Sequence, residues 1–250
     1  MKISIVTAVY NDPRIARALG SILSQKHDHE LEIIVVDGAS TQETQNAINN
    51  YRSHITVFIS EPDEGIYQAM NKGIAKATGD IIGILNADDQ YSDTLALRDV
   101  TNTFGSSSTE AVYGDLLYVN ESGQTLRYWK SHSPGRLKWY RGWMPPHPTF
   151  FVRREVYDKY GVFDLDFGTA ADYELMLRLV FKHRVNTAYI DRVLVHMATG
   201  GTTTPTIPTV LRQNYQVFRA WRHNDLRFGL AVPFLKVASK PLQFFIHPRT

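Results

Sequence analysis

The stretch GDIIGILNADD, residues 79–89, decides the fold of this chain. Ile81–Leu85 is short and almost wholly apolar, a pattern typical of a strand that is buried on both faces. It ends abruptly in Asn86–Asp89, which holds two carboxylates and an amide. Carboxylates this close repel each other and resist burial, so they need water or a cation. A divalent metal that carries a diphosphate meets that need; the alternative for an isolated tetrapeptide of this kind is a solvated turn with a helix cap.

Composition restricts the class of protein. The chain has 250 residues, of which 43% are hydrophobic and 21% charged, as in one large or two small globular domains. It has no cysteine, which excludes disulfides, thiolate nucleophiles and zinc–thiolate sites. That composition fits a cytoplasmic protein. The N-terminus runs directly into Ile3–Val6 without a separate basic region or cleavage site, so no signal peptide is expected.

The charge is unevenly distributed along the chain. The net charge is +2, but residues 201–250 alone carry a net +6, with Asp225 as their one acid. The remaining 200 residues therefore carry a net −4. A basic tail on a mildly acidic body suggests that the tail meets something anionic.

The first hundred residues alternate between buried strands and amphipathic helices. The expected strands are 2–10, 31–36, 55–60 and 81–85; a helix follows Asn11-Asp12-Pro13, another runs from the Ser40/Glu43 capping box to about Tyr51, and a third covers Ile66–Ala77. This order predicts a parallel sheet with right-handed crossovers, whose ligands bind at the carboxyl ends of the strands. The polar residues Asn11-Asp12, Asp37, the Glu61–Gly65 loop and Asn86–Asp89 all fall at those ends.

The second half has a different pattern. Ala111–Asn120 and Gln124–Trp129 alternate around a Glu121–Gly123 turn, which predicts a β-hairpin. The further expected elements are strands at 150–152 and 185–190 and helices at 155–160 and 172–182, with an irregular segment at 139–150. There is neither an internal repeat nor a low-complexity linker, so we expect the two halves to share one core.

Six segments together resemble the inverting glycosyltransferases of family 2. They are SIVTAVYND, EIIVVDGAST, EPDEGIYQAMNKGIAKATGD, GILNADD, PPHPTFFVRREVYDKYGVFD and ADYELMLRL, and they cover roughly residues 3 to 182 in the family's order. The chain is most similar to bacterial polysaccharide and glycolipid transferases of that family. The resemblance implies an α/β GT-A (nucleotide-diphosphosugar transferase) fold over residues 1–205. Residues 1–105 would form the nucleotide-binding half and 106–205 the acceptor-binding half, followed by an amphipathic helical extension at 206–250.

The resemblance also assigns residues to the sugar-nucleotide donor. Asp37 would accept a hydrogen bond from the base or ribose, with Thr7 and Val9 lining the base and Asp63 at its edge. Asn71 and Lys72 belong to the motif that closes over the donor. Many relatives carry arginine where Met70 stands, so the contact made by that arginine is not expected here. UDP is the expected nucleotide because the family uses it most.

A divalent metal, Mn²⁺ or Mg²⁺, is the implied cofactor. Asp88 would bind it, and Asp89 would lie on the donor sugar or in the metal shell. Asn86 takes the place of the first acid of the family's DxD triplet, which leaves fewer formal charges on the metal. His196 could complete the shell, as a histidine does in some GT-A enzymes; an ordinary buried or surface histidine is the alternative.

Asp172 is the expected general base. Inversion needs one group that takes the proton from the acceptor hydroxyl, while a cation offsets the charge that develops on the leaving diphosphate. The family counterpart of Asp172 usually follows an acid, and Ala171 stands there in this chain. The alternative interpretation of Asp172 is a helix N-cap.

Two loops complete the expected site. His147, in the rigid Pro145–Pro148 segment, would lie beside the acceptor, with a surface histidine as the alternative. Gly200-Gly201 with Thr202–Thr204 resembles a loop that orders over the donor diphosphate, although a simple linker would look the same.

The C-terminal segment is apolar and basic. Ile207–His223 has helical spacing, and Leu226–Ile246 is interrupted by Pro233 and Pro241, which argues against a membrane span. Residues 207–247 fit an interfacial helix on an anionic membrane, which would make the protein peripheral on the inner face of the cell membrane and close to a lipid-linked saccharide acceptor. The alternative is a helical hairpin packed on the catalytic domain.

Other classes of protein fit less well. A sugar-nucleotide nucleotidyltransferase needs a glycine- and basic-rich loop after the first strand, and Ala8–Arg17 has no glycine. A dinucleotide oxidoreductase needs GxGxxG there. Asn86 and Ala171 leave open a degenerate protein that binds nucleotide-sugars without turnover. Nucleic-acid binding is not expected, because the basic residues lie in an apolar tail.

Overall fold

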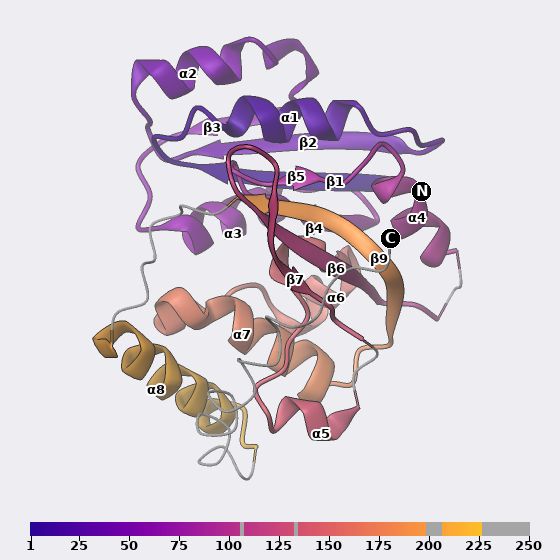
Figure 1. The fold of residues 1–250 in the computed structure, drawn as a ribbon, viewed down its shortest axis with the longest axis vertical. Helices are drawn as coiled ribbons and strands as arrows, with labels where there is room; N and C mark the ends of the chain where they lie inside the picture. The colour runs from indigo at the N-terminus through magenta and orange to yellow at the C-terminus, as the bar shows by residue number, and fades with distance from the viewer. Residues whose placement is uncertain (106–107, 133–134, 199–206, 227–250) are drawn as a thin grey trace.

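A single mixed sheet forms the centre of the molecule (Figure 1). The structure is a computed structural model that describes residues 1–105, 108–132, 135–198 and 207–226, with side chains in the last range from Arg212 onward. Within these residues, nine strands pair in the order β3-β2-β1-β4-β8-β6-β9-β5, and β7 pairs with β6. The two halves of the chain therefore share one sheet.

The N-terminal half alternates strands and helices as predicted. Its elements are β1 (Lys2–Val9), α1 (Ile15–Leu23), β2 (Glu30–Asp37), α2 (Gln42–Asn49), the 3₁₀ turn η1 (Arg52–His54), β3 (Val57–Ser60), α3 (Ile66–Lys76), β4 (Ile81–Ile84), β5 (Gln90–Tyr91) and α4 (Ala96–Thr103). Strands β3, β2, β1 and β4 are mutually parallel. The third strand is shorter than expected: it begins at Val57, three residues after the end of η1.

Both faces of this parallel region are buried, which explains its nearly continuous apolar sequence. Along β1, Ile3 and Ile5 pack in one hydrophobic cluster with α1 and α4, while Val6 and Ala8 pack in the other with α3. Strand β2 divides in the same way, with Ile33 on the first face and Ile34 on the second. A period of two within an all-apolar run thus fills two separate layers.

The C-terminal half adds strands of both directions. Its elements are β6 (Ala111–Val119), β7 (Thr125–Trp129), α5 (Arg136–Trp139), η2 (His147–Thr149), β8 (Phe151–Arg153), α6 (Arg154–Tyr160), η3 (Leu165–Ala170), α7 (Ala171–Met176), the π-helical segment η4 (Leu177–Lys182), β9 (Thr187–Ala198) and α8 (Ile207–His223). The predicted hairpin is confirmed, with Val119 opposite Thr125. Strand β8 lies antiparallel between β4 and β6, whereas β9 runs parallel to β6.

Two local predictions are wrong. Strand β9 extends from Thr187 to Ala198, well past the expected end at Ile190, because it pairs along almost the whole of β6. The Ser40/Glu43 capping box does not form, since Thr41 precedes α2 and makes no side-chain cap. Ser40 Oγ instead accepts a hydrogen bond from the Asn11 backbone amide at 2.8 Å, which ties together the loops after β1 and β2.

Helix α8 packs against the body of the protein. Val217, Ala220 and Trp221 are buried, and the indole nitrogen Nε1 of Trp221 donates a hydrogen bond to the Tyr173 hydroxyl at 2.8 Å. Figure 1 shows α8 alongside α7, on the side of the sheet away from α1 and α2. Among the residues that the structure describes, no helix is long and apolar enough to cross a membrane. Leu226–Ile246 lies outside the described residues from position 227 onward.

Candidate active site

The carboxyl ends of the parallel strands meet at one edge of the sheet. Val9 at the end of β1 is in register with Asp37 at the end of β2, and Asp37 with Ser60 at the end of β3. The Leu85 amide donates to the Val6 carbonyl at 3.0 Å, so Asn86–Asp89 begins directly beside the last residues of β1. The polar clusters that the sequence placed at strand ends are therefore neighbours.

Asp89 is a buried carboxyl group. It has no exposed surface, and its Oδ2 accepts a hydrogen bond from Asn86 Nδ2 at 2.8 Å. Burial, followed by the charge of Asp88, raises the pKa of Asp89 to about 8. Within the described residues neither Asp89 Oδ1 nor Asn86 Oδ1 has a hydrogen-bond partner, although both atoms are buried.

Asp88 is more accessible, with 19% of its side chain exposed. Burial raises its pKa as well, but the nearby guanidinium of Arg14 opposes the shift. Arg14 Nη2 lies 3.5 Å from Asp88 Oδ2 and 2.6 Å from Asp12 Oδ2. The segment 86–89 thus faces a cationic side chain from the loop after β1.

The chemistry of this segment fits a hard divalent cation. Mg²⁺ and Mn²⁺ prefer oxygen ligands, and Mg²⁺ sites combine one or two carboxylates with phosphate oxygens and water. Asn86 and Asp89 each supply one buried oxygen, Oδ1, that has no hydrogen-bond partner among the described residues, and Asp88 supplies a carboxylate. Among the described residues no three acidic, histidine or cysteine side chains gather into a ready-made site, so most ligands would come from the donor and from water.

His196 lies next to this segment but not in a ligand cluster with it. It pairs with Gln90 across β5 and β9, one residue beyond Asp89. Burial lowers the pKa of its imidazole below the ordinary value, so the neutral ring that metals require is favoured. Its place in a metal shell stays a prediction.

The expected base-binding residues lie at the ends of β1 and β2. Asp37 is fully buried, and its carboxylate accepts hydrogen bonds from the Ser40 amide, Gln45 Nε2 and Ser60 Oγ. Thr7 Oγ1 is buried and has no partner within the described residues. The Val9 side chain packs in the core, and its carbonyl accepts from the Gly38 amide at 2.9 Å. Much of the hydrogen-bonding capacity of Asp37 is therefore used within the protein.

The loop before α3 brings Asp63 against Gly38. A Cβ atom on Gly38 would lie 2.6 Å from Asp63 Oδ2, so a larger residue at position 38 would force that carboxylate to move. Lys72 forms an ion pair with Glu61 at 2.7 Å. Asn71 exchanges two hydrogen bonds with the backbone of Phe163, at 2.8 and 3.0 Å. This exchange joins the two halves of the chain, and a donor contact for Asn71 stays a prediction.

A cavity of about 220 Å³ brings together three of the predicted residues from distant parts of the chain. Asn86, His147 and Asp172 all line it. The rest of its wall is mostly apolar and consists of Ile66, Tyr67, Met70, Leu116, Tyr118, Trp129, Met144, Pro148 and Met197. Residues predicted for the donor side and for the acceptor side therefore line one cavity.

Asp172 is positioned by the first turn of α7. The helix begins at Ala171 with Ala170 at the N-cap, so the N-cap interpretation of Asp172 is wrong. Its Oδ1 accepts a hydrogen bond from the Tyr173 amide at 2.7 Å. Tyr67 lies close to Asp172, and burial, followed by the Asp172 charge, raises the Tyr67 pKa well above its ordinary value. Tyr67 therefore stays protonated and can donate to the carboxylate.

His147 begins the short helical turn η2. Its Nε2 is buried and finds no hydrogen-bond partner among the described residues. Burial lowers the pKa of the ring, and the charge of Asp172 only partly offsets this effect. A neutral imidazole beside a carboxylate in a cavity is suited to bind a hydroxyl group.

The sequence did not identify several cavity residues. Tyr118 and Trp129 come from the predicted hairpin, where their rings stack with centroids 6.4 Å apart. The alternation of apolar and polar residues that predicted this hairpin does not indicate that it folds over the end of β4. Tyr67 belongs to a motif that the sequence singled out, but its place beside Asp172 brings together residues far apart in the chain.

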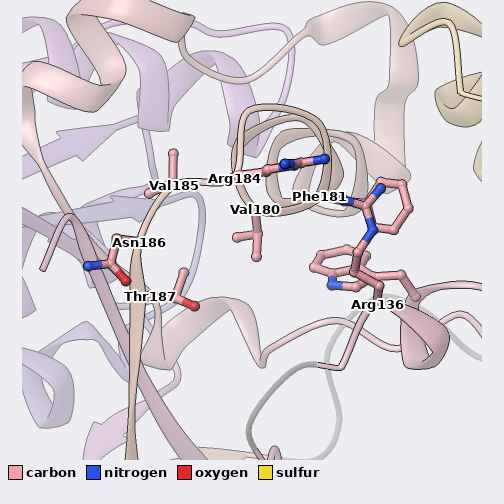
Figure 2. A pocket seen from close by; sticks show the side chains of 8 residues that line it. Arg136, Val180, Phe181, Arg184, Val185, Asn186 and Thr187 are labelled. Carbon is pink, nitrogen blue, oxygen red and sulfur yellow. The ribbon is translucent and has the colours of Figure 1, made fainter.

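A larger cavity lies elsewhere. It measures about 670 Å³ and opens between α5, η4 and the start of β9, lined by Trp139, Val180, Phe181, Val185, Asn186, Thr187 and two arginines (Figure 2). Arg136 stacks on Phe181 with its guanidinium carbon 4.5 Å from the ring centre. None of the predicted site residues lines this cavity, so its size does not make it the candidate active site.

The fold and the site define a class, the GT-A glycosyltransferases. The structure is similar to that of Staphylococcus aureus TarS 1–349 in complex with UDP-GlcNAc, with a TM-score of 0.67, 15% identity, and coverage of 92% of this chain and 69% of that one. It is also similar to the mannosyltransferase PcManGT from Pyrobaculum calidifontis in complex with GDP-Man and Mn²⁺, with a TM-score of 0.66, 18% identity, and coverage of 97% and 71%. The chain spans 42% of a longer TarS chain.

Sequence comparison gives the family. The model of glycosyl transferase family 2 matches residues 4–163. An uncharacterized glycosyltransferase of Mycobacterium tuberculosis is 30% identical over 181 residues, covering 70% of this chain and 68% of its own length. A PGL/p-HBAD biosynthesis glycosyltransferase of Mycobacterium bovis is 26% identical over 195 residues, covering 76% and 74%. The chain belongs to glycosyl transferase family 2 and is a glycosyltransferase, as the sequence motifs predicted.

Proposed function

We propose that this protein is a metal-dependent, inverting glycosyltransferase. It transfers a sugar from a nucleotide-diphosphosugar, with UDP as the first nucleotide to test, to a hydroxyl of a saccharide or lipid-linked acceptor. The observation that carries this proposal is the cavity shared by Asn86, His147 and Asp172. It places the end of β4, where the donor diphosphate would lie, opposite a carboxylate that can act as a base.

Relatives support the choice of substrates. A structural neighbour binds UDP-GlcNAc and another binds GDP-Man with Mn²⁺, and a sequence relative acts in PGL/p-HBAD biosynthesis. We infer that this chain takes a nucleotide-sugar of the same general kind and acts in cell-surface polysaccharide or glycolipid synthesis. Asp37, Asp63 and Thr7 would hold the nucleoside at the ends of β1 and β2.

The reaction would use a single base. Asp172 removes the proton from the acceptor hydroxyl while that oxygen forms a bond to the anomeric carbon, and the bond from that carbon to the diphosphate oxygen breaks. The hydrogen bond from the Tyr173 amide holds the Asp172 carboxylate in place, and the protonated Tyr67 hydroxyl lies close to it. His147 Nε2 would bind an acceptor hydroxyl and orient it. A divalent metal held by Asn86, Asp88 and Asp89 would offset charge on the leaving diphosphate.

Replacement of the base tests this proposal. Asp172→Asn keeps the shape of the side chain and removes its basicity, so we expect kcat to fall roughly 10²–10⁴-fold with a nearly unchanged donor dissociation constant. Release of UDP, GDP or dTDP from the corresponding sugar nucleotides, with Mn²⁺ and candidate acceptors, gives the readout. Asp166→Asn, which changes an exposed acid just before α7, is the matched control. Equal rates for Asp172→Asn and wild type would exclude Asp172 as the base.

A degenerate protein that binds donors without turnover would give a different result. It would show nucleotide binding in a thermal-shift assay with Mn²⁺, but neither transfer nor hydrolysis with any donor. If UDP, GDP and dTDP all fail to stabilise the wild-type protein, with and without metal, then the donor-site proposal fails as a whole.

We also propose that the C-terminal segment brings the enzyme to an anionic membrane surface, on the cytoplasmic side. The support is the net +6 charge of residues 201–250 together with their aromatic content. Helix α8 itself packs on α7 through Trp221, so the membrane contact would fall to residues 227–247.

A further inference from the structure

Arg14 connects the loop after β1 to the candidate metal-binding segment. It is the N-cap residue of α1 and lies where β1 ends, beside the end of β4. Its Nη2 forms an ion pair with Asp88 at 3.5 Å, and its charge also lowers the pKa of buried Asp89 relative to what burial alone would give. None of the sequence motifs predicted a role for Arg14 in the site.

Asp12 fixes the orientation of this guanidinium. Arg14 Nε lies 2.9 Å from Asp12 Oδ1 and 3.1 Å from Oδ2, and Arg14 Nη2 lies 2.6 Å from Oδ2. The Arg14 backbone amide donates to the same carboxylate at 3.0 Å. The side chain is therefore held toward 86–89. Within the part of the chain that the structure describes, its Nη1 has no hydrogen-bond acceptor, and 32% of the side chain is exposed.

The pair with Asp88 conflicts with metal binding to the same carboxylate. A divalent cation on Asp88 would lie within a few ångströms of the Arg14 charge, and like charges repel strongly at such separations even near the protein surface. A donor diphosphate removes the conflict, because its oxygens can neutralise both cations. Arginine is well suited to pair with either group, since the N–H donors of its planar guanidinium match phosphate oxygens as well as carboxylate oxygens.

We propose that Arg14 is a donor-binding residue that pairs with Asp88 in the free enzyme and exchanges it for the donor diphosphate when metal and nucleotide bind together. The proposal rests on the proposed function, because it requires a nucleotide-diphosphosugar at the end of β4. It predicts that metal and nucleotide each bind weakly alone and strengthen each other, with equal coupling in both directions. Asp12 keeps Arg14 in place throughout.

Isothermal titration calorimetry on the full-length chain tests the exchange. The titrants are Mn²⁺ alone, UDP alone, and UDP at saturating Mn²⁺. For Arg14→Gln we expect Mn²⁺ alone to bind severalfold more tightly, because Asp88 loses its competing partner. UDP with Mn²⁺ should bind about 10- to 100-fold more weakly, the usual effect of losing a hydrogen bond between charged groups. Arg14→Lys, which keeps the charge without the fork, should lie between these results and wild type.

Arg17→Gln is the matched control. Arg17 lies one turn further along the same helix and is exposed, so its replacement changes the net charge equally without touching Asp88. Melting temperatures of the variants show whether each is folded before titration. Binding in Arg17→Gln should equal that of wild type.

Three results would overturn the proposal. If Arg14→Gln binds UDP with Mn²⁺ as tightly as wild type, Arg14 does not bind the diphosphate. If Mn²⁺ alone binds Arg14→Gln no more tightly than wild type, Arg14 does not compete with the metal for the Asp88 carboxylate. If wild type binds none of UDP, GDP and dTDP with or without Mn²⁺, both this proposal and the proposed function fail, whereas the first two results leave the proposed function intact.

Discussion

At the scale of single residues, the carboxyl group of Asp89 dominates the electrostatics of the site. It is fully buried, and its pKa of about 8 lies far above that of an exposed aspartate. At neutral pH most molecules of the free protein therefore carry a proton there. Binding of a cation would favour loss of this proton, so metal affinity should rise with pH.

The same proton makes folding stability depend on pH. Between about pH 4 and pH 8 the folded state binds a proton on Asp89 that the unfolded state has released, so wild type loses stability as pH rises across this window. Asp89→Asn has no such proton. Between pH 5 and pH 8 we expect the free energy of unfolding of Asp89→Asn to rise by up to about 4 kcal/mol relative to that of wild type, because one pKa unit corresponds to about 1.4 kcal/mol.

Urea unfolding at pH 5, 6, 7 and 8, in buffer with EDTA, measures this difference. Asp28→Asn, in the exposed loop before β2, is the control and should follow wild type at every pH. A constant difference between Asp89→Asn and wild type from pH 5 to 8 would show that Asp89 is not protonated in the folded protein.

At the scale of elements, the part of α8 whose side chains are described packs on the protein through one buried stripe, Val217, Ala220 and Trp221. Trp221 has no exposed surface and lies 5.0 Å from the ring of Phe181 and 5.1 Å from that of Tyr140, measured between centroids. Asn224 Nδ2 donates to the buried carboxylate of Glu174 at 3.0 Å. The opposite side of the helix carries exposed Tyr215.

Removal of the indole should therefore loosen α8 and destabilise the protein. For Trp221→Ala we expect a loss of about 3–5 kcal/mol, the usual cost of emptying a large aromatic site. In a protein of this size that corresponds to a fall in melting temperature of very roughly 6–20 °C. Differential scanning calorimetry measures it, with Tyr215→Ala as the control on the same helix. If the two variants melt together, α8 does not pack on α7 in solution.

At the scale of the whole molecule, both halves and α8 share one core. The sheet runs from β3 to β5 without a break between the halves, and Val217, Ala220 and Trp221 belong to the same hydrophobic cluster as Val6 in β1 and Ile82 in β4. A division into a catalytic domain at 1–205 and an extension at 206–250 stays a prediction, which truncation can test.

Two truncated chains separate the role of α8 from that of the residues after it. A chain that ends at Leu226 should melt within a few degrees of the full chain, whereas one that ends at Pro205 should melt far lower, because it exposes the side chains that contact Trp221. In a flotation assay with phosphatidylglycerol vesicles, only the full chain should float. If the chain that ends at Leu226 floats equally well, the membrane contact lies before residue 227. If the full chain stays unbound, the proposed membrane contact is refuted.

Local pattern predicted the parallel half of the fold well. The runs at Ile3–Val9 and Ile81–Leu85 are typical of strands buried on two faces, and the parallel order follows from the helices between them. Local pattern did not predict the length of β9, because that length depends on pairing with β6. The Ser40/Glu43 box failed for a similar reason, since Ser40 bonds to Asn11 from a distant loop.

The sequence by itself determined the family and the carboxyl ends of the parallel strands, where its polar residues gather, because each follows from motifs a few residues long. Only the tertiary structure decided which side chains share a cavity. Tyr67 with Asp172, Arg14 with Asp88 and Asn71 with Phe163 all join segments whose separation carries no local signal. The physical reason is that burial and charge pairing depend on distance in space, which a short stretch of sequence does not encode.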